Sequence, residues 1–278
     1  RKPGRLILTG SLSFSNKIGI RESFTGRSAN LRFDSMTFSE TTSEAPNLKT
    51  IQRYLKMGGM PAVCFLRDTN QISRYWTEWL ETSCQKDLIE FSKGRLDPDL
   101  AYQILEATCQ LELPNATNIA RKIKADTRRI KTHLDALEAL FLVRNWNADS
   151  QSVGKTMYLP FDCGIATYFK ADLRRVWQSW VAHQVVNHAR ALGKKEIRLN
   201  YNLSTRGSFA DFSFEKDVLL FNDEAYPSAL LERTIAALQK RLPGRKITIF
   251  SQTDQKSQAL GKHVISRPWK DVLQFLPS

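Results

Sequence analysis

The stretch at residues 115–146, NATNIARKIKADTRRIKTHLDALEALFLVRNW, constrains the fold more strongly than any other part of the chain. Two short runs of helical periodicity meet at Lys124–Ala125, and Asp126 is well placed to cap the second helix because its side chain can accept a backbone N–H. The apolar positions of the second run are Ile130, Leu134, Leu137 and Phe141. Two short helices that each carry one apolar side predict a helix-turn-helix.

The outer side of this helix pair is rich in residues that can bind phosphates or base edges. The candidate DNA-binding residues are Arg121, Lys122, Arg128, Arg129, Lys131 and Thr132. The segments LFLVRNW and KTMYLP follow, and they predict a two-stranded hairpin around the polar loop 147–154. This arrangement is that of a winged helix, and we expect it to bind double-stranded DNA. Two alternatives remain open: a small helical subdomain with a solvated basic surface, and a winged helix that docks a protein.

The charge of the chain also favours a nucleic-acid partner. The 278 residues have 41 Lys and Arg against 28 Asp and Glu, which gives a formal net charge of +13. Such an excess indicates an acidic partner, most often nucleic acid, with a basic solvated surface as the alternative. No apolar stretch approaches the ~18 residues that would span a bilayer. The four cysteines are scattered, as expected in a reducing compartment. We therefore expect a cytoplasmic protein with no membrane partner and no metal site.

The rest of the chain alternates between helical and extended patterns. Residues 47–109 have helical periodicity, interrupted at MGGMP (57–61) and GRLDPD (94–99). A helix is predicted at 173–192, and another at 229–242 with Ser228 as its cap. Strands are predicted at 196–201, 209–214, 217–221 and 246–250. This order of elements is typical of an α/β protein.

Four motifs that occur in a fixed order resemble those of one protein family. They are LILTGS, ESFTGR, YLKMGGMPAV and the winged helix followed by KTMYLPFDCGIATYF. Together they resemble a large prokaryotic family of AAA-type P-loop ATPases, in which a nucleotide-binding core precedes a helical segment, a winged helix and a C-terminal domain related in fold to restriction-endonuclease-like nucleases. The resemblance implies an α/β multidomain protein with four parts: the end of the ATPase core at 1–45, the helical segment at 46–112, the winged helix at 113–165 and a small nuclease-like α/β domain at 170–278.

The same resemblance implies roles for three residues near the start of the chain. Because LILTGS resembles a sensor-1 strand, Thr9 and Ser11 would lie near a γ-phosphate and orient an attacking water. Arg27 matches an arginine finger that stabilises charge on a neighbouring subunit's nucleotide. The alternative is that Thr9 and Ser11 cap the strand and Arg27 pairs with Glu22 or Asp34. The chain has no G-x-x-x-x-G-K-[ST] stretch, so we expect ATP and Mg²⁺ to bind the full-length protein and not this chain alone.

For the last domain the resemblance implies an inactive nuclease. An active member of that fold has a carboxylate on an early helix, an Asp that starts one strand and Glu-x-Lys on the next, which together hold Mg²⁺ and a water. Asp211 matches the Asp, but Gln178 and its neighbours stand where the helix needs Glu. The next strand has Phe-Asn-Asp in place of Glu-x-Lys. We expect a degenerate site at Asp211 and no cleavage; a rearranged metal site with nearby carboxylates is the alternative.

Taken together, the residues and the resemblance predict the C-terminal part of an AAA-type ATPase whose winged helix binds DNA. The alternative is a protein-interaction module without nucleic-acid binding, and a metal-dependent nuclease is a more distant one. A homo-oligomer or a protein partner is compatible with the prediction, because relatives of this class commonly form rings or clusters.

Overall fold

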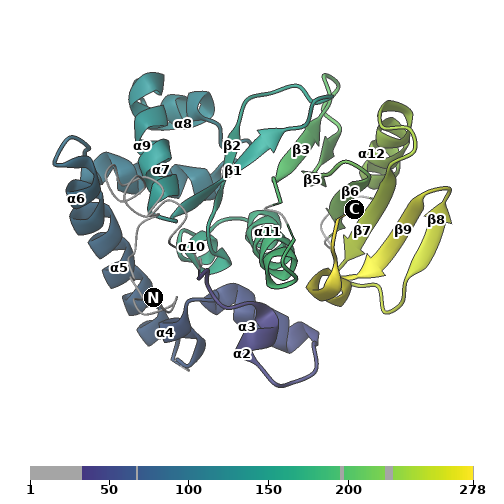
Figure 1. Cartoon of the computed structure of the whole chain (residues 1–278), viewed down its shortest axis with the longest axis horizontal. Coiled ribbons are helices and arrows are strands. Elements are labelled where there is room, and N and C mark those ends of the chain that lie inside the picture. Colours follow the sequence, from purple (N-terminus) through teal and green to yellow (C-terminus); the bar gives the residue numbers. More distant parts are fainter. Residues whose placement is uncertain (1–32, 67, 195–196, 223–227, 278) are drawn as a thin grey trace, which may run out of the picture.

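The computed structural model describes residues 33–66, 68–194, 197–222 and 228–277. Thr9, Ser11 and Arg27, the predicted sensor-1 and arginine-finger residues, lie outside these ranges. Within them the chain forms a mixed α/β fold with helices and two mixed sheets, which confirms the predicted class at that level (Figure 1).

The first part of the described chain is helical, as the periodicity of residues 47–109 predicts. Its helices are α2 (Phe38–Thr41), α3 (Leu48–Met57), α4 (Pro61–Cys64), α5 (Thr69–Glu81), the π-helix η2 (Thr82–Asp87), α6 (Leu88–Ser92) and α7 (Pro98–Gln110). Both predicted interruptions are present, because α3 ends before Gly58 and α6 ends before Lys93 and Gly94. All three residues have positive φ, which stops a right-handed helix.

The helix pair and hairpin predicted at 115–160 are also present. Their elements are α8 (Ala116–Ile123), α9 (Thr127–Ala139), β1 (Val143–Ala148) and β2 (Met157–Pro160). Lys124 ends α8 in a left-handed conformation at φ 56°, and the side chain of Asp126 accepts the backbone N–H groups of Arg128 and Arg129 at 2.9 and 3.0 Å. The cap predicted for the second helix is therefore confirmed. Strands β1 and β2 pair antiparallel, with Val143 opposite Pro160.

The remainder of the chain is mixed. Its elements are α10 (Cys163–Tyr168), α11 (Leu173–Ala191), β3 (Asn200–Leu203), β4 (Phe209–Ala210), β5 (Phe212–Ser213), β6 (Asp217–Asn222), α12 (Ser228–Arg241), β7 (Lys246–Ser251), β8 (Gln258–Gly261), β9 (Val264–Pro268) and the 3-10 helix η3 (Trp269–Gln274). One prediction is wrong here: residues 209–214 do not form a single strand. The backbone leaves one sheet and enters the other at Asp211, which lies between β4 and β5.

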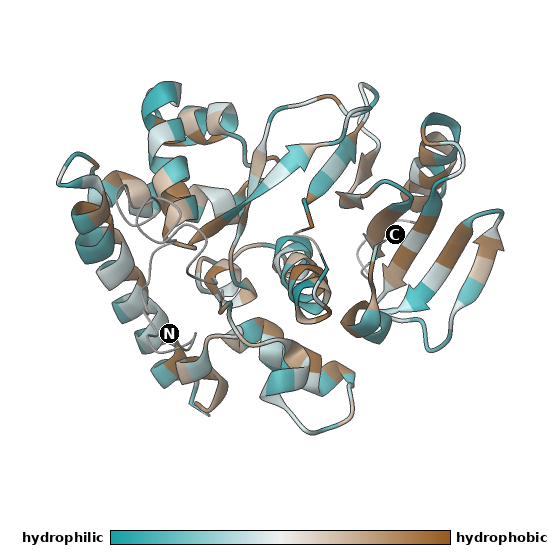
Figure 2. Cartoon of the chain, viewed as in Figure 1, coloured by the Kyte–Doolittle hydropathy of each residue, from teal (hydrophilic) through white to brown (hydrophobic). Residues whose placement is uncertain are grey.

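Two sheets organise this half of the molecule. The four-stranded sheet has the order β2-β1-β3-β4, and the five-stranded sheet has the order β5-β6-β7-β9-β8 with β6, β7 and β9 parallel. Helix α12 packs against one face of the five-stranded sheet, and α11 with η3 packs against the other. Figure 2 shows hydrophobic colour along most of β6 and β7, as expected for strands covered on both faces.

The core crosses the domain boundaries that the sequence suggests. One buried cluster contains Ile51 from α3, Trp146 from β1, and Trp177 from α11 with Phe221 from β6. The rings of Trp177 and Phe221 stack with their centroids 4.4 Å apart. In addition, β1 pairs in parallel with β3 at two positions, so a single sheet joins residues on both sides of 165–170. The helical segment, the hairpin and the C-terminal sheets are therefore packed against one another.

Candidate nucleic-acid interface and two buried polar clusters

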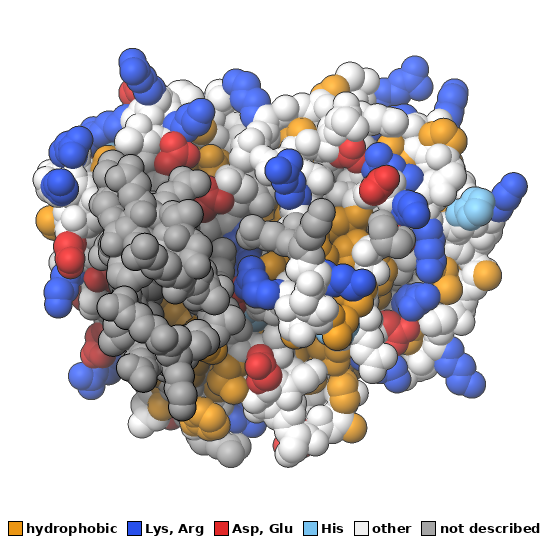
Figure 3. Space-filling view, in the orientation of Figure 1, with side chains coloured by type: hydrophobic (Ala, Val, Ile, Leu, Met, Phe, Trp, Pro, Cys, Tyr) orange, Lys and Arg blue, Asp and Glu red, His pale blue; other side chains and the backbone are white. Residues whose placement is uncertain are grey.

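The helix pair α8–α9 buries one side and exposes the other. Ile119, Ile130 and Leu134 are each fully buried. All six side chains predicted to bind DNA belong to exposed residues: Arg121, Lys122, Arg128, Arg129, Lys131 and Thr132. Figure 2 shows hydrophilic colour on the outer side of these helices, and Figure 3 shows Lys and Arg side chains projecting from the region where Figure 1 places them. All six predicted residues are therefore exposed on α8 and α9, opposite the apolar positions that these helices bury.

One of the six is already engaged by a carboxylate. The guanidinium of Arg129 donates to Asp97 Oδ2 at 2.7 Å, and both side chains are about half exposed (54% and 42%). Asp97 also caps α7 through its other oxygen, which accepts the backbone N–H groups of Asp99 and Leu100. Asp97 therefore places a negative charge beside Arg129 that competes with any phosphate for this guanidinium.

Asp211, the predicted degenerate nuclease position, lies at the centre of a buried polar cluster. Its side chain is fully buried. Its oxygens accept hydrogen bonds from the guanidinium of Arg174 at 3.0 and 3.1 Å, from the amide of Gln178 at 2.7 Å and from the backbone N–H of Phe221 at 2.8 Å. The three positions compared with the nuclease pattern, Gln178, Asp211 and Phe221, therefore meet in space. In the nuclease pattern the carboxylate would face Mg²⁺, whereas in this protein it faces the guanidinium of Arg174.

A second buried cluster lies where α3, α10 and α11 meet. Asp162 is 1% exposed and caps α10 by accepting the backbone N–H of Gly164 at 2.7 Å. It also accepts the backbone N–H of Gly59 at 3.0 Å, although Gly59 is 103 residues away in the chain. Burial raises the pKa of Asp162, and the N–H groups of Gly164 and Gly59 oppose that shift because they stabilise the carboxylate. Two of the motifs that carry the family resemblance, MGGMP and FDCG, are therefore joined through this carboxylate.

Met36 connects the same region to the segment that precedes it in the chain. Its backbone N–H donates to Gly59 O at 2.6 Å, and its carbonyl accepts from the hydroxyl of Tyr54 at 2.5 Å. The Nε2 of His183 on α11 lies 3.3 Å from the same carbonyl. Asp34 nearby forms an ion pair with Arg190 of α11. Residues 34–36 are thus attached to both α3 and α11.

His183 is a buried, neutral histidine. Burial and the neighbouring Arg144 cation lower its pKa from 6.5 to about 3. The guanidinium of Arg144, on β1, lies 3.3 Å from His183 Nδ1, so Nδ1 is the acceptor and Nε2–H donates to Met36 O. The charged groups around it are Arg144, Asp34 and Arg190, and Asn187 packs beside it on the same helix. His183 is therefore part of the packing between β1, α11 and residues 34–36.

The depressed pKa of His183 predicts a pH-dependent loss of stability. Because unfolded His183 binds a proton below pH 6.5 and the folded side chain does not until about pH 3, the unfolded state gains protons as the pH falls through this window. We expect His183→Gln to have a flatter stability profile than the wild type between these pH values, as measured by urea unfolding. His188→Gln on the same helix is the control and should keep the wild-type profile. Equal slopes for wild type and His183→Gln would contradict the assignment.

The cysteines offer no reactive thiol in the described part of the chain. Cys64, Cys84, Cys109 and Cys163 are all buried and unpaired with one another. Burial raises the pKa of the Cys64 thiol to about 11 and that of Cys84 to about 12, so both are protonated near neutral pH. In the described ranges no group of three or more His, Cys, Asp or Glu side chains is arranged to hold a metal ion.

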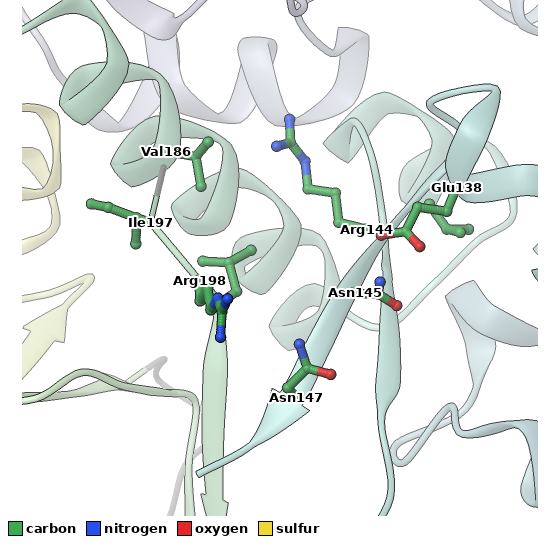
Figure 4. Close-up of a pocket in the computed structure, with 9 residues that line it drawn as sticks. Glu138, Arg144, Asn145, Asn147, Val186, Ile197 and Arg198 are labelled. Atoms are coloured by element: carbon green, nitrogen blue, oxygen red, sulfur yellow. The ribbon is translucent and has the colours of Figure 1, made fainter. Parts of the chain in front are cut away.

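A pocket of about 460 Å³ opens between β1 and residues 197–199 (Figure 4). It exists because β1 and β3 pair only at Asn147 and Ala148 and diverge before that point. Figure 4 shows Asn145 and Asn147 on one side of β1, with the guanidinium of Arg144 pointing away from them. Two arginines, the carboxylate of Glu138, two asparagine amides and aliphatic side chains line the pocket together, so its lining is mixed in charge.

Sequence reasoning identified Asp211 and the exposed basic residues, but not the partners that define the clusters. Arg174 and Asp162 were not among the candidates, although Asp162 directly follows the apolar strand YLPF and precedes Cys-Gly, where a helix cap is common. The contact of Asp162 with Gly59 has no local signal in the sequence.

Comparison with protein families gives a match to part of the chain. A family model described as a domain of unknown function (DUF8612) matches residues 48–176. The matched segment contains both motifs that Asp162 joins, together with the helix pair and the hairpin. No curated protein and no solved structure matches the chain. In the described residues, no helix has the length and apolar character needed to cross a membrane.

Proposed function

We propose that this chain is the C-terminal part of an AAA-type ATPase and that it binds double-stranded DNA through α8 and α9. The observation that carries the DNA-binding proposal is the exposure of all six predicted residues on α8 and α9, with the apolar side of both helices buried. In a helix-turn-helix the N-terminal residues of the second helix approach base edges while the first helix crosses the backbone. Arg128 and Lys131, on α9, therefore have the position that approaches base edges. Arg121 and Lys122, on α8, have the position that crosses the DNA backbone.

The geometry of the helix pair and hairpin supports a winged helix, and the meeting of Gln178, Asp211 and Phe221 supports a degenerate nuclease-like site. The link to an ATPase rests on the resemblance of LILTGS and ESFTGR, which lie outside the described residues. Its test is the coding sequence upstream of Arg1: in-frame Walker A and Walker B motifs would support it, and a stop codon close upstream would exclude it. A protein-docking module is the second candidate, favoured by the engagement of Arg129 with Asp97.

The experiment that separates the two candidates is duplex binding measured across a range of salt concentrations. We expect Arg128→Ala/Lys131→Ala to bind duplex DNA more weakly by about 1–3 kcal/mol for each base contact that is lost, and with a shallower salt dependence where a phosphate contact is lost. The matched control is Arg233→Ala/Lys240→Ala, which removes the same residue types from exposed positions on α12. Helix α12 is well separated from α8 and α9 in Figure 1. Undetectable binding at low salt, or equal binding by both double variants, would contradict the proposal.

The ion pair of Asp97 with Arg129 gives a prediction of opposite sign. Asp97→Asn should bind duplex DNA several-fold more tightly, because it releases Arg129 and removes a charge that repels phosphate, while the amide oxygen can still cap α7. Asp99→Asn is the control, since it makes the same change of charge two residues away on an exposed position. Binding by Asp97→Asn no tighter than that of Asp99→Asn would place Asp97 and Arg129 outside the interface.

A further inference from the structure

The loop between β1 and β2 is held against the C-terminal sheets over most of its length. The backbone N–H of Asp149 donates to Tyr201 O at 2.8 Å, and the backbone N–H of Val153 donates to Leu203 O at 2.9 Å. Asp149 also forms an ion pair with Arg245, at 2.5 Å. The pKa of Asp149 is lowered to about 2 by the hydrogen bonds and charge of its partners, against the opposing effect of burial. This part of the loop is therefore attached to β3 and to the turn before β7.

Lys155, near the end of that loop, contacts α8 instead. The ammonium of Lys155 donates to Thr117 Oγ1 at 3.1 Å, in the first turn of α8, and Lys155 is exposed. Its carbonyl accepts from the hydroxyl of Tyr201 at 2.8 Å, which holds the backbone in place. The next strand continues the contact, because Met157 forms an isolated bridge with Asn115, the cap of α8. Lys155 is therefore fixed beside the start of the first helix of the pair.

Lys155 and the basic residues of the last turn of α8 occupy opposite ends of one helix. Helix α8 has 8 residues, which is about 12 Å at 1.5 Å per residue. Arg121 and Lys122 lie in its last turn, and the side-chain cap Asn115, Thr117 and Lys155 lie at its first. Protein contacts to phosphate commonly come from Lys, Thr and helix N-termini, and a helix in this position crosses the DNA backbone. The basic side chains at the two ends of α8 can therefore contact phosphates of the same DNA strand.

We propose that Lys155 is a phosphate-binding residue of the duplex interface and that the rest of the β1–β2 loop, residues 149–153, does not contact the duplex. This inference rests on the proposed DNA binding by α8 and α9. It extends the interface beyond the six residues of the helix pair. From the hairpin it adds one cation, that of Lys155. Lys155 contacts a phosphate of the DNA strand that passes α8. This contact does not depend on the base sequence.

The test is a salt titration of duplex binding by variants of the full chain. Lys155→Ala should weaken binding several-fold on every duplex sequence and reduce the slope of log K against log salt by about 0.9, the value for one lost phosphate contact. Lys155→Arg, which keeps the charge, should bind like the wild type. Gln151→Glu adds a negative charge to an exposed residue of the docked loop and should leave binding unchanged at physiological salt. Lys256→Ala, at an exposed position before β8, controls for the overall charge.

The outcomes separate this inference from the function on which it rests. If Arg128→Ala/Lys131→Ala weakens binding while Lys155→Ala does not, the interface excludes Lys155 and only the present inference fails. If Gln151→Glu weakens binding as much as Lys155→Ala does, the loop contacts DNA and the proposed division of the hairpin is wrong. If the wild type does not bind duplex DNA at low salt, both proposals fail together. Thermal melting of Lys155→Ala should match the wild type, since the residue is exposed.

Discussion

Asp211→Ala should lower the free energy of unfolding by about 3–5 kcal/mol, the usual cost of removing one partner from a buried ion pair. The fully buried carboxylate is bonded to Arg174, Gln178 and the backbone N–H of Phe221. Its loss removes the carboxylate that faces a guanidinium only 23% exposed, and it takes the acceptor away from a buried amide and a backbone N–H. Urea unfolding measures the effect directly.

Two further variants distinguish an ion pair from a catalytic carboxylate. Arg174→Met should lower the free energy of unfolding less than Asp211→Ala does, because Asp211 keeps its hydrogen bonds to Gln178 and Phe221. The double variant Asp211→Leu/Arg174→Met should be more stable than Asp211→Ala, since it leaves no buried charge of that pair uncompensated. A supercoiled plasmid incubated with Mg²⁺ or Mn²⁺ is the activity assay. A metal-dependent nick by the wild type that Asp211→Ala abolishes, under conditions where urea unfolding shows this variant to be folded, would overturn a purely structural role.

The helices could be predicted from the sequence because the residues that define a helix, its apolar positions and its cap, lie close together in the chain. In α9 the apolar positions at intervals of three and four residues, together with the Asp126 cap, gave both the element and the side that faces the core. The hairpin was accessible for the same reason, since the polar loop 147–154 separates two apolar strands. The exposed side of α8 and α9 then followed from the helical repeat, and all six predicted residues lie there.

The parts that sequence reasoning missed depend on contacts between distant segments. The apolar content of residues 209–214 favoured one strand, but the buried Asp211 turns the backbone from one sheet to the other. Strand β8 was missed because all four of its residues are exposed, so it has no alternation of buried and exposed positions. The ion pair of Arg174 with Asp211 joins residues 37 apart, and no spacing rule predicts it.

The second large effect is expected at Gly58, where the MGGMP motif meets Asp162. Gly58 has φ +82° and ψ −177°, a conformation that essentially only glycine adopts and that costs another residue about 1–3 kcal/mol. A Cβ atom here would also overlap Asp162 Oδ1 and come within 3.0 Å of the Gly164 backbone. Because these are the atoms through which Asp162 caps α10, Gly58→Ala must displace the carboxylate from its hydrogen bonds. We expect a total loss of more than about 3 kcal/mol in the free energy of unfolding.

Gly244→Ala is the control that isolates the role of Asp162. Gly244 has the same φ of +82°, but a Cβ atom there would meet nothing within 4 Å. Its substitution should therefore show the cost of a positive φ without any overlap, and a loss at Gly58 well above the loss at Gly244 would support displacement of the Asp162 carboxylate. Equal destabilisation would mean that the carboxylate moves aside freely and does not fix the turn. A larger loss at Gly58 would explain in physical terms why MGGMP and FDCG occur together in one chain, because each motif supplies half of a single buried contact.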